Sequence, residues 1–401
     1  MTGRPSVWMA PGAGLREQVA HAWAASPAQR ARLAAAAIDP AEVTGPESLM
    51  ALPVMRKDQL GPVQSRERPF GGLLGEPLGS LARIFLSPGE IYDPQGTAPD
   101  YWRFGTALAA AGFQAGDVVL NCFNYHLSPA GFIFDAAARS LGCVVIPAGV
   151  GQMDMQIQAV RDTGATGFIG LPSYLLSLLE KGGGNLPLTK ALVTAEPLPS
   201  SLRSKLEAFG LQVSESYGTA DLGLVAYQCP HREGLHFDAG VIVEICDPEG
   251  HPVAMGEVGE VVVTALDRTY PLLRFGTGDL SAMMVEPCPC GRPALRMARW
   301  MGRANDVVKV RGMFVYPRQL EEAMARFGPQ VAHWQAVVDQ DEHHRDRLRV
   351  LVEPANGGGP AAEAVGEAVR ATTRMSAEVI LVAGGTIPAE ARRLEDRRRW
   401  E

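Results

Sequence analysis

From residue 101 to about residue 217 the chain alternates short apolar runs with stretches of helical spacing. The apolar runs are DVVLNCFNY, CVVIPAG, GFIGLP, KALVTAE and LQVSESYG. Strands that alternate with helical patterns of about 10–15 residues form right-handed βαβ crossovers, which place the strands parallel in one sheet. Near-continuous apolar strands are expected where helices cover both faces of the sheet. The sequence therefore predicts an α/β layer in this region.

The pattern changes after about residue 235. The stretch HFDAGVIVEICDPEGHPVAMGEVGEVVVTALD contains two β runs joined by the turn-rich sequence DPEG, which predicts an antiparallel barrel or sheet. Beyond GRANDVVKVRG, the helical patterns PRQLEEAMARF and AAEAVGEAVRATTRM alternate with strand-like runs and predict a compact α+β unit. The predicted fold class is α/β and α+β, with a large N-terminal domain over residues 1–305 and a small C-terminal domain over residues 306–401.

Composition excludes several classes of protein. The 401 residues are 46% hydrophobic and 20% charged, which is enough to bury a core and excludes disordered and low-complexity chains. A formal net charge of −7 without a basic stripe does not favour nucleic-acid binding. No apolar run reaches the roughly 18 residues of a membrane span, and the first residues lack the pattern of a secretory signal. We therefore expect a cytoplasmic protein that binds neither membrane nor nucleic acid.

Three of the cysteines lie in loops rich in Pro and charged or glycine residues. Cys229 lies in QCPHREGLH, and Cys288 and Cys290 lie in CPCGR. In a cytosolic chain such cysteines are metal ligands rather than disulfide partners, and together with a histidine they would form a closed structural Zn²⁺ site. His231 and His236 are competing candidates for the fourth ligand, and unpaired loop thiols are the alternative. The cysteines expected to be buried in apolar runs are Cys122, Cys143 and Cys246.

Four stretches in a fixed order carry a resemblance to a known family. They are ESYGTADLG, YPLLRFGTGDLS, GRANDVVKVRGMFVYPRQLEE and the C-terminal domain. Together they resemble the adenylate-forming superfamily of acyl-CoA synthetases, and within it the phenylacetate–coenzyme A ligase group. Residues 145–179 and the N-terminal helices ending in LPVMRKDQL are also similar to that group. The resemblance implies a large domain with a mobile C-terminal lid, which forms acyl-AMP from ATP and an acid and then transfers the acyl group to coenzyme A.

The resemblance also implies roles for single residues. Tyr217 would stack near adenine, Thr219 would reach phosphate oxygens, and Asp221 would bind Mg²⁺. Asp279 would accept hydrogen bonds from both ribose hydroxyls, and Arg303 would contact ribose or phosphate. A carboxylate suits a vicinal diol and a guanidinium suits phosphate. From the residues alone, however, Asp279 could be a turn residue and Tyr217 a core aromatic. The other nucleotide-binding residues implied are Ser216, Gly218, Ala195, Glu196 and Pro197.

The same resemblance places an acyl pocket at FNYHLSPAGF, residues 123–132. Tyr125, His126 and Gly131 are the substrate-binding residues that it implies. His126 could instead be a buried histidine with satisfied hydrogen bonds, and Tyr125, Phe132 and Phe134 could be core residues. The expected substrate is a small carboxylic acid, aromatic by preference, and the expected assembly is a homodimer. The resemblance also favours His236 as the fourth zinc ligand and marks Asp306 as the hinge of the lid.

Two segments depart from the family pattern. RIFLSPGEIYDPQG, residues 83–96, keeps only Ser87 and Gly89 of a glycine- and serine-rich phosphate loop, and Pro88 removes a backbone N–H donor. Near the C-terminus, the position of the adenylation lysine is held by Glu390, whose carboxylate would repel an adenylate; Arg392 or Arg393 is a candidate substitute. Two alternatives to the ligase therefore stay open. One is a degenerate protein that binds nucleotide or acyl ligand, and the other passes the acyl group to an amine or a carrier protein.

Overall fold

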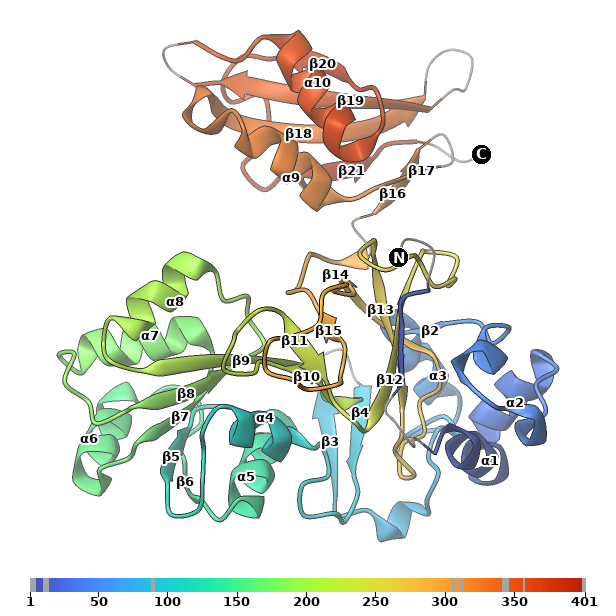
Figure 1. The fold of residues 1–401 in the computed structure, drawn as a ribbon, viewed down its shortest axis with the longest axis vertical. Coiled ribbons are helices and arrows are strands. Elements are labelled where there is room, and N and C mark those ends of the chain that lie inside the picture. Colours follow the sequence, from blue (N-terminus) through green and yellow to red (C-terminus); the bar gives the residue numbers. More distant parts are fainter. Residues whose placement is uncertain are drawn as a thin grey trace. The chain divides into compact units, whose positions relative to one another are not determined.

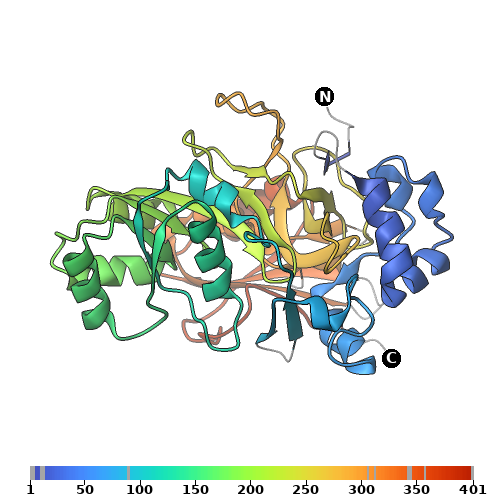
Figure 2. The ribbon, with the colours of Figure 1, turned by 90° about the horizontal axis from the view of Figure 1, so that it is seen from below.

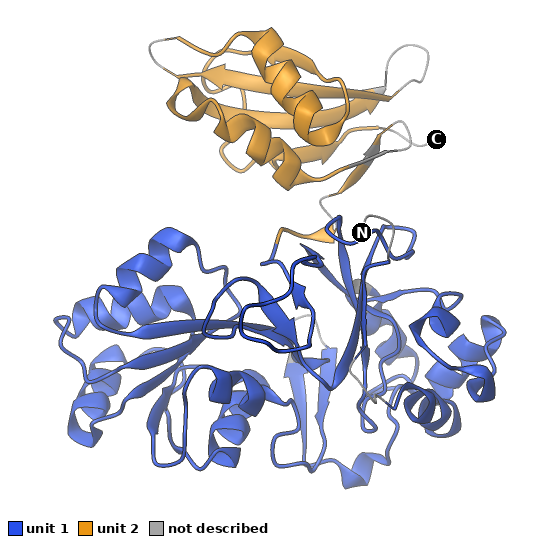
Figure 3. Ribbon diagram, viewed as in Figure 1, with its two compact units in different colours: residues 1–300 blue, residues 301–401 orange. Residues whose placement is uncertain are grey.

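The computed structural model describes residues 5–9, 14–87, 91–304, 307–310, 313–340, 346–355 and 358–398. The chain divides into two compact units, Met1–Trp300 and Met301–Glu401 (Figure 3). The boundary expected from the sequence, after residue 305, lies a few residues inside the second unit. The expected hinge residue Asp306 and the phosphate-loop residues Pro88 and Gly89 lie outside the described residues.

An eight-stranded sheet forms one half of the first unit (Figure 1). Its strand order is β15-β11-β10-β9-β8-β7-β5-β6. Strands β5 to β9 pair in parallel, whereas β10, β11 and β15 continue the sheet in antiparallel orientation. The predicted α/β layer is therefore present. The bounds are β5 Val118–Asn121, β6 Val144–Pro147, β7 Gly167–Gly170, β8 Lys190–Val193, β9 Gln212–Thr219, β10 Gly223–Tyr227, β11 Leu235–Phe237 and β15 Arg296–Met297.

Helices cover both faces of the parallel strands. Successive residues of a strand point to opposite faces, and Val119 of β5 accordingly packs with α4 and α5, while its neighbour Leu120 packs with the other helices. Buried residues on both faces explain why these strands read as continuous apolar runs. The helices on the first face are α4 Phe104–Ala110 and α5 Ala130–Ser140. Those on the second face are α6 Met153–Thr163, α7 Pro172–Lys181 and α8 Ser200–Glu207.

A five-stranded sheet forms the other half of the first unit, in the order β1-β12-β13-β14-β2. Strands β12, β13 and β14 are antiparallel, as the sequence predicts for the region after residue 235, and β2 joins the edge in parallel with β14. The bounds are β1 Val7–Met9, β2 Met55–Arg56, β12 Val241–Cys246, β13 Val258–Ala265 and β14 Phe275–Ala282. Between β2 and the α/β layer the chain forms α3 Leu60–Arg66 and the hairpin of β3 Arg83–Ser87 and β4 Ile91–Gln95.

The N-terminal helices α1 Leu15–Ala25 and α2 Pro27–Ala35 pack beside this second sheet. Figure 2 shows them on the side of the sheet away from the α/β layer. Ser26 caps α2 by accepting a hydrogen bond from the backbone N–H of Gln29, and Pro27 suits the first helical position. The buried Arg274 donates to the carboxylate of Glu244 at 3.0 Å and to the Leu52 carbonyl at 2.8 Å, so it ties the N-terminal segment to the sheet. The connecting 3₁₀ turns are η1 Pro40–Glu42, η2 Pro46–Leu49, η3 Lys57–Gln59 and η4 Leu78–Ser80.

The second unit is an α+β sandwich, as the sequence predicts. Its four-stranded sheet has the order β20-β19-β18-β21, and α9 and α10 pack together over its apolar face. The short strand β21 was not expected; it pairs in parallel with β18. Among the described helices of the chain, none has the length and apolar character needed to cross a lipid bilayer. The bounds are β16 Val308–Val310, β17 Met313–Val315, α9 Pro317–Ala325, η6 Gly328–Gln330, β18 Val331–Gln340, β19 Asp346–Pro354, α10 Ala362–Thr373, β20 Glu378–Leu381 and β21 Leu394–Asp396.

Candidate functional site

Strands from the two sheets of the first unit meet at Tyr217 and Asp279. The Tyr217 hydroxyl, on β9, donates to Oδ2 of Asp279 on β14 at 2.9 Å. The other carboxylate oxygen, Oδ1, accepts the indole N–H of Trp300 at 2.9 Å. Asp279 follows Gly278, whose φ of 75° lies in the left-handed region, and this kink in β14 turns the carboxylate toward β9. Two of the residues singled out in the sequence are thus in direct contact.

The turn after β9 holds Asp221 in place. Trp102 donates its indole N–H to the Ala220 carbonyl at 3.0 Å, and Arg103 donates to the Leu222 carbonyl at 2.6 Å. A Cβ at Gly218 would lie 2.4 Å from the carbonyl oxygen of residue 223, so only glycine permits this close approach of β9 and β10. These contacts fix the backbone of the turn, and the Asp221 side chain enters the protein with 1% of its surface exposed.

Lys57 is a residue of this site to which the sequence analysis assigned no role. Its Nζ donates to Oδ2 of Asp221 at 2.6 Å, while Oδ1 of Asp221 is buried and accepts no hydrogen bond from the described residues. Burial disfavours the ammonium, but Asp221 and the more distant carboxylates of Asp93 and Asp279 outweigh it and raise the pKa of Lys57. Lys57 therefore stays positively charged at neutral pH, and its side chain is partly exposed.

A long-range strand pairing places Lys57. Met55 and Arg56 form β2 and pair in parallel with Phe275 and Gly276 of β14, so the next residue, Lys57, emerges beside the site. Arg56 anchors the pair through an ion pair with Glu260 at 3.1 Å. The run LPVMRKDQL is too short to predict a strand. The strand that pairs with it, β14, lies more than two hundred residues further along the chain. The adjacent cations Arg56 and Lys57 within the run were the signal that the sequence offered.

The TAEP segment, residues 194–197, lies at the carboxyl end of β8. The Thr194 hydroxyl donates to the Ser216 carbonyl at 2.7 Å, and Glu196 accepts from the Ser173 hydroxyl at 2.6 Å. The exposed Ala195 has φ of 68°, which is an unfavourable conformation for a residue with a Cβ and is typical of functional loops. The Ser216 hydroxyl is buried and forms no hydrogen bond among the described residues, so it is a polar atom that a ligand could satisfy.

The predicted acyl-pocket residues lie beyond the carboxyl end of β5. The Asn121 amide donates to both the Tyr125 hydroxyl and the Gly131 carbonyl, each at 2.8 Å. A Cβ at Gly131 would lie 2.7 Å from the Tyr125 ring, so the glycine allows this ring to pack against α5. Strand β5 lies between β6 and β7, and such a switch point is where open α/β sheets bind ligands. Asn121 joins the candidate pocket as a further residue that the sequence analysis missed.

Not all expectations for this region hold. His126 is exposed, so its interpretation as a buried histidine is wrong. Its backbone N–H donates to the Asn124 side chain at 3.1 Å, which fixes the loop but leaves the imidazole at the surface. Phe134 packs in the core between Phe104 and Phe123. Burial raises the pKa of Tyr125, so the phenol stays protonated.

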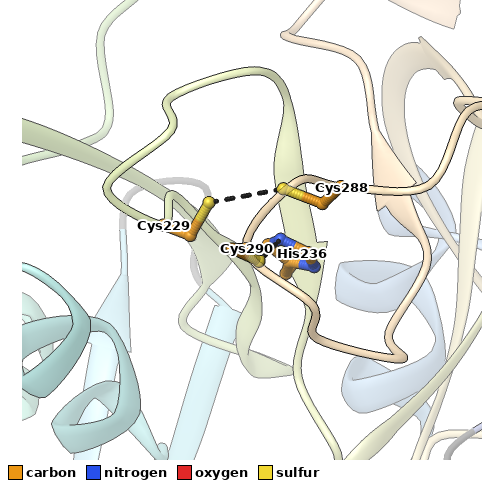
Figure 4. Close-up of side chains that lie close together, drawn as sticks. All are labelled: Cys229, His236, Cys288 and Cys290. Atoms are coloured by element: carbon orange, nitrogen blue, oxygen red, sulfur yellow. Dashed lines mark hydrogen bonds between the residues drawn. The ribbon is translucent and has the colours of Figure 1, made fainter.

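Cys229, His236, Cys288 and Cys290 come together as the sequence predicts (Figure 4). Each residue offers one atom that could bind a metal, a sulfur or an imidazole nitrogen, and these four atoms all lie within 4.8 Å of one another. The sulfurs of Cys229 and Cys288 are 3.6 Å apart, and Nε2 of His236 is 3.2 Å from the sulfur of Cys290. Nδ1 of His236 contacts the Ala294 carbonyl at 3.0 Å, which orients Nε2 toward the thiols.

The loop around Cys290 favours a thiolate. Although burial opposes the negative charge, hydrogen bonds from the Arg292 backbone, Cys288, the Arg292 side chain and Cys229 lower the pKa of Cys290 to about 7. His231, the competing fourth ligand, is not part of the group that the structure brings together.

The remaining candidates belong to the second unit. Arg303 is exposed at its beginning, and Glu390 is exposed near its end. Arg393 places its guanidinium 4.9 Å from the centre of the Trp334 ring and donates to the Trp334 carbonyl, so this arginine is already engaged within the second unit. The loop before Glu390 is anchored by Glu353, which accepts the backbone N–H of residue 387 at 2.6 Å.

Comparisons with known proteins agree with this architecture. The AMP-binding enzyme family model matches residues 100–265, and the model of the AMP-binding enzyme C-terminal domain matches residues 312–398. Phenylacetate-coenzyme A ligase of Thermus thermophilus is 31% identical over 349 residues, which cover 82% of this chain and 77% of that protein. The chain belongs to the phenylacetate–coenzyme A ligase family of adenylate-forming enzymes.

Other relatives fit this family. Phenylacetate-coenzyme A ligase of Escherichia coli K12 is 29% identical over 364 residues, covering 84% of this chain and 80% of that ligase. An open conformation of 2-hydroxyisobutyryl-CoA ligase, solved with 2-HIB-AMP and CoA, superposes with a TM-score of 0.84. The two sequences are 23% identical, and the aligned region covers 95% of this chain and 89% of the 2-hydroxyisobutyryl-CoA ligase chain. The two proteins therefore share a fold. The predicted family and fold class are thus confirmed.

Proposed function

We propose that this ligase-family protein activates a small carboxylic acid with ATP, forming an acyl-adenylate, and transfers the acyl group to coenzyme A. The observation that carries the proposal is the meeting of Tyr217 and Asp279 beside the Lys57–Asp221 ion pair, in a chain of the phenylacetate–coenzyme A ligase family. Adenylation of an acid needs little base catalysis, because a carboxylate is already ionised at neutral pH. It needs positive charge and donors that stabilise the transferring phosphate.

The nucleotide would bind between β9, β14 and the TAEP segment. Asp279 offers two carboxylate oxygens to the ribose hydroxyls, and Tyr217 holds one of these oxygens in place while its ring lies beside the nucleoside. The unsatisfied Ser216 hydroxyl is a donor for the nucleotide, and the backbone of Ala195, Glu196 and Pro197 would line the adenine. Gly218 allows the close approach of β9 and β10 beside Tyr217. A contact of Arg303 with ribose or phosphate stays a prediction.

Asp221 fits a role in Mg²⁺ binding. Its Oδ1 is buried without a hydrogen-bond partner among the described residues, and a carboxylate oxygen is a hard ligand of the kind that Mg²⁺ prefers. Bound there, the ion would supply positive charge to the phosphates, with the Thr219 hydroxyl close by in the same turn. The Lys57 ammonium already holds Oδ2, so it would share this carboxylate and add a second positive charge.

Lys57 is also the best candidate for the role that the family assigns to a C-terminal lysine. Glu390 stands at that position, and Arg393 is engaged with Trp334. Lys57 is partly exposed and stays protonated, so it can orient the acid carboxylate or an α-phosphate oxygen. The acid itself would lie against Tyr125 and Gly131, near His126 at the mouth of the pocket, and an aromatic acid suits the neighbouring Phe132 ring. A homodimer and a cytoplasmic location stay predictions.

The proposed function is tested by pyrophosphate release with a panel of aromatic and aliphatic acids, with and without coenzyme A. We expect acid-dependent pyrophosphate release, and coenzyme A should convert it to steady turnover with thioester formation. The Asp279→Ala variant is the control: it should lose nucleotide binding, because hydrogen bonds to a charged acceptor contribute roughly 1.5–3 kcal/mol each. Release that needs an amine instead of coenzyme A would favour the amide-forming alternative. No release with any acid would favour a degenerate binding protein.

Replacing Lys57 should impair adenylation. Loss of one preorganised donor to a developing oxyanion costs about 10²–10³ in rate, so Lys57→Met should slow pyrophosphate release by that factor. Lys181→Met is the matched control, because Lys181 also pairs with an aspartate, Asp154 at 2.8 Å, but on the surface of α7. Thermal unfolding of both variants separates a folding defect from a catalytic one. A folded Lys57→Met protein with a rate within threefold of wild type would contradict the role of Lys57.

We further propose that the Cys229, His236, Cys288 and Cys290 cluster binds one structural Zn²⁺. Three thiolates and an imidazole are the ligand set of closed zinc sites. The sulfur–sulfur distance of 3.6 Å and the sulfur–nitrogen distance of 3.2 Å are close to the separations that neighbouring ligands have around one tetrahedral ion. The cluster joins the end of β10 to the loop before β15, so the ion would crosslink the antiparallel edge of the large sheet.

Elemental analysis of the reduced, purified protein should find about one zinc per chain. The double variant Cys288→Ser, Cys290→Ser should lose the metal and melt several degrees lower, since about 1 kcal/mol corresponds to roughly 2–4 °C in a domain of 150–250 residues. Cys143→Ser, at a buried cysteine outside the cluster, should keep the wild-type zinc content. Full zinc content in the double variant, or none in the reduced wild type, would exclude this site.

A further inference from the structure

Trp300 is a large aromatic residue that stays at the surface, with 42% of its accessible area exposed. It is nevertheless held in one place, because its indole N–H donates to Oδ1 of Asp279 at 2.9 Å. This is one of the two oxygens that the proposed function assigns to the ribose hydroxyls. Tyr217 holds the other oxygen at 2.9 Å. Both sides of the ribose acceptor are thus occupied by donors of the protein itself.

We propose that Trp300 is a latch that occupies the ribose site in the nucleotide-free protein and that the incoming nucleotide displaces. The inference rests on the proposed function, because it takes Asp279 as the ribose acceptor. A vicinal diol that binds both carboxylate oxygens competes directly with the indole N–H for Oδ1. Tyr217 lies within strand β9 and is only partly exposed, whereas Trp300 lies outside the strands and is 42% exposed, so solvent is available to the displaced indole.

Arg299, the residue before Trp300, is also anchored to β9, by an ion pair. Nε of Arg299 lies 3.5 Å from Oε2 of Glu215, and Arg203 holds the same oxygen at 3.1 Å. Glu215 is two residues before Tyr217 on β9, so the two side chains project from the same face of the strand. Residues 299 and 300 are therefore fastened side by side to the two strands that form the nucleotide site.

The position of the latch in the chain gives it a second consequence. Trp300 is the last residue of the first unit, and the chain enters the second unit at the next residue. Displacing the indole would leave two side-chain anchors on the described residues of this segment, the Arg299–Glu215 ion pair and the Ser281 hydroxyl, which donates to the carbonyls of residues 298 and 299. With Arg299 38% exposed, that pair is weakened by solvent. Nucleotide binding would thus loosen the start of the connection to the second unit.

The latch is tested by calorimetric titration of AMP into wild type and Trp300→Phe. Phenylalanine keeps an aromatic ring but has no N–H, so the variant should bind AMP about three- to tenfold more tightly. The decisive comparison uses 2′,3′-dideoxy-AMP, which cannot compete for Asp279 through ribose hydroxyls. Wild type and Trp300→Phe should bind the dideoxy nucleotide with equal affinity, a pattern that a general change in pocket shape would not produce.

Tryptophan fluorescence gives a second readout. AMP should shift the emission of wild type as the indole moves into solvent, and Trp300→Phe should lack this shift. Trp23→Phe, which removes an indole on α1 instead, should keep both the shift and the wild-type affinity. Equal or weaker AMP binding by Trp300→Phe would overturn the latch while leaving the nucleotide site standing. Absence of AMP binding by every variant would contradict the nucleotide site itself, and the latch with it.

Discussion

The ion pair between Lys57 and Asp221 joins a segment near the start of the chain to the turn after β9. The Asp221 carboxylate is almost wholly buried, with 1% of its side chain exposed, and a buried charge without a partner is costly, at about 3–5 kcal/mol. The pairing of β2 with β14 therefore also stabilises the turn after β9, because it positions the Lys57 ammonium that compensates the buried charge of Asp221. It also places that ammonium within electrostatic reach of Asp279, so the same strand pairing brings together the cation and the carboxylate that we propose as the ribose acceptor.

The parts of this arrangement that depend on local patterns could be predicted from the sequence. Apolar runs such as GFIGLP, alternating with helical segments, predicted the parallel strands, because burial on both faces of a strand requires a continuous run of apolar residues. The grouping of Cys229, His236, Cys288 and Cys290 could also be predicted, because metal binding is the role that best suits such residues in loops. For the fourth ligand, the resemblance to the ligase family favoured His236, and the structure brings that histidine to the thiols.

The parts that depend on distant pairings could not be predicted. Nothing local in MRK indicates that Met55 pairs with Phe275, and Lys57 acquires its partner only through that register. Strand β21 is three residues long and forms because β18 offers an open edge to it. The hydrogen bond from Trp300 to Asp279 likewise joins residues 21 positions apart, and no local pattern in the sequence indicates it. For His126, burial was the alternative to substrate binding, and the structure excludes that alternative because the residue is exposed.

Oxygen transfer from the acid to the nucleotide tests the central claim most directly. The acid that supports the fastest pyrophosphate release would be labelled with ¹⁸O in both carboxylate oxygens and incubated with the protein, ATP and coenzyme A. If the carboxylate attacks the α-phosphorus and coenzyme A then attacks the acyl carbon, the bridging oxygen leaves with the nucleotide. Mass spectrometry should therefore find one ¹⁸O atom in the AMP and none in the pyrophosphate. Unlabelled AMP, or ADP with labelled phosphate, would contradict an acyl-adenylate mechanism at this site.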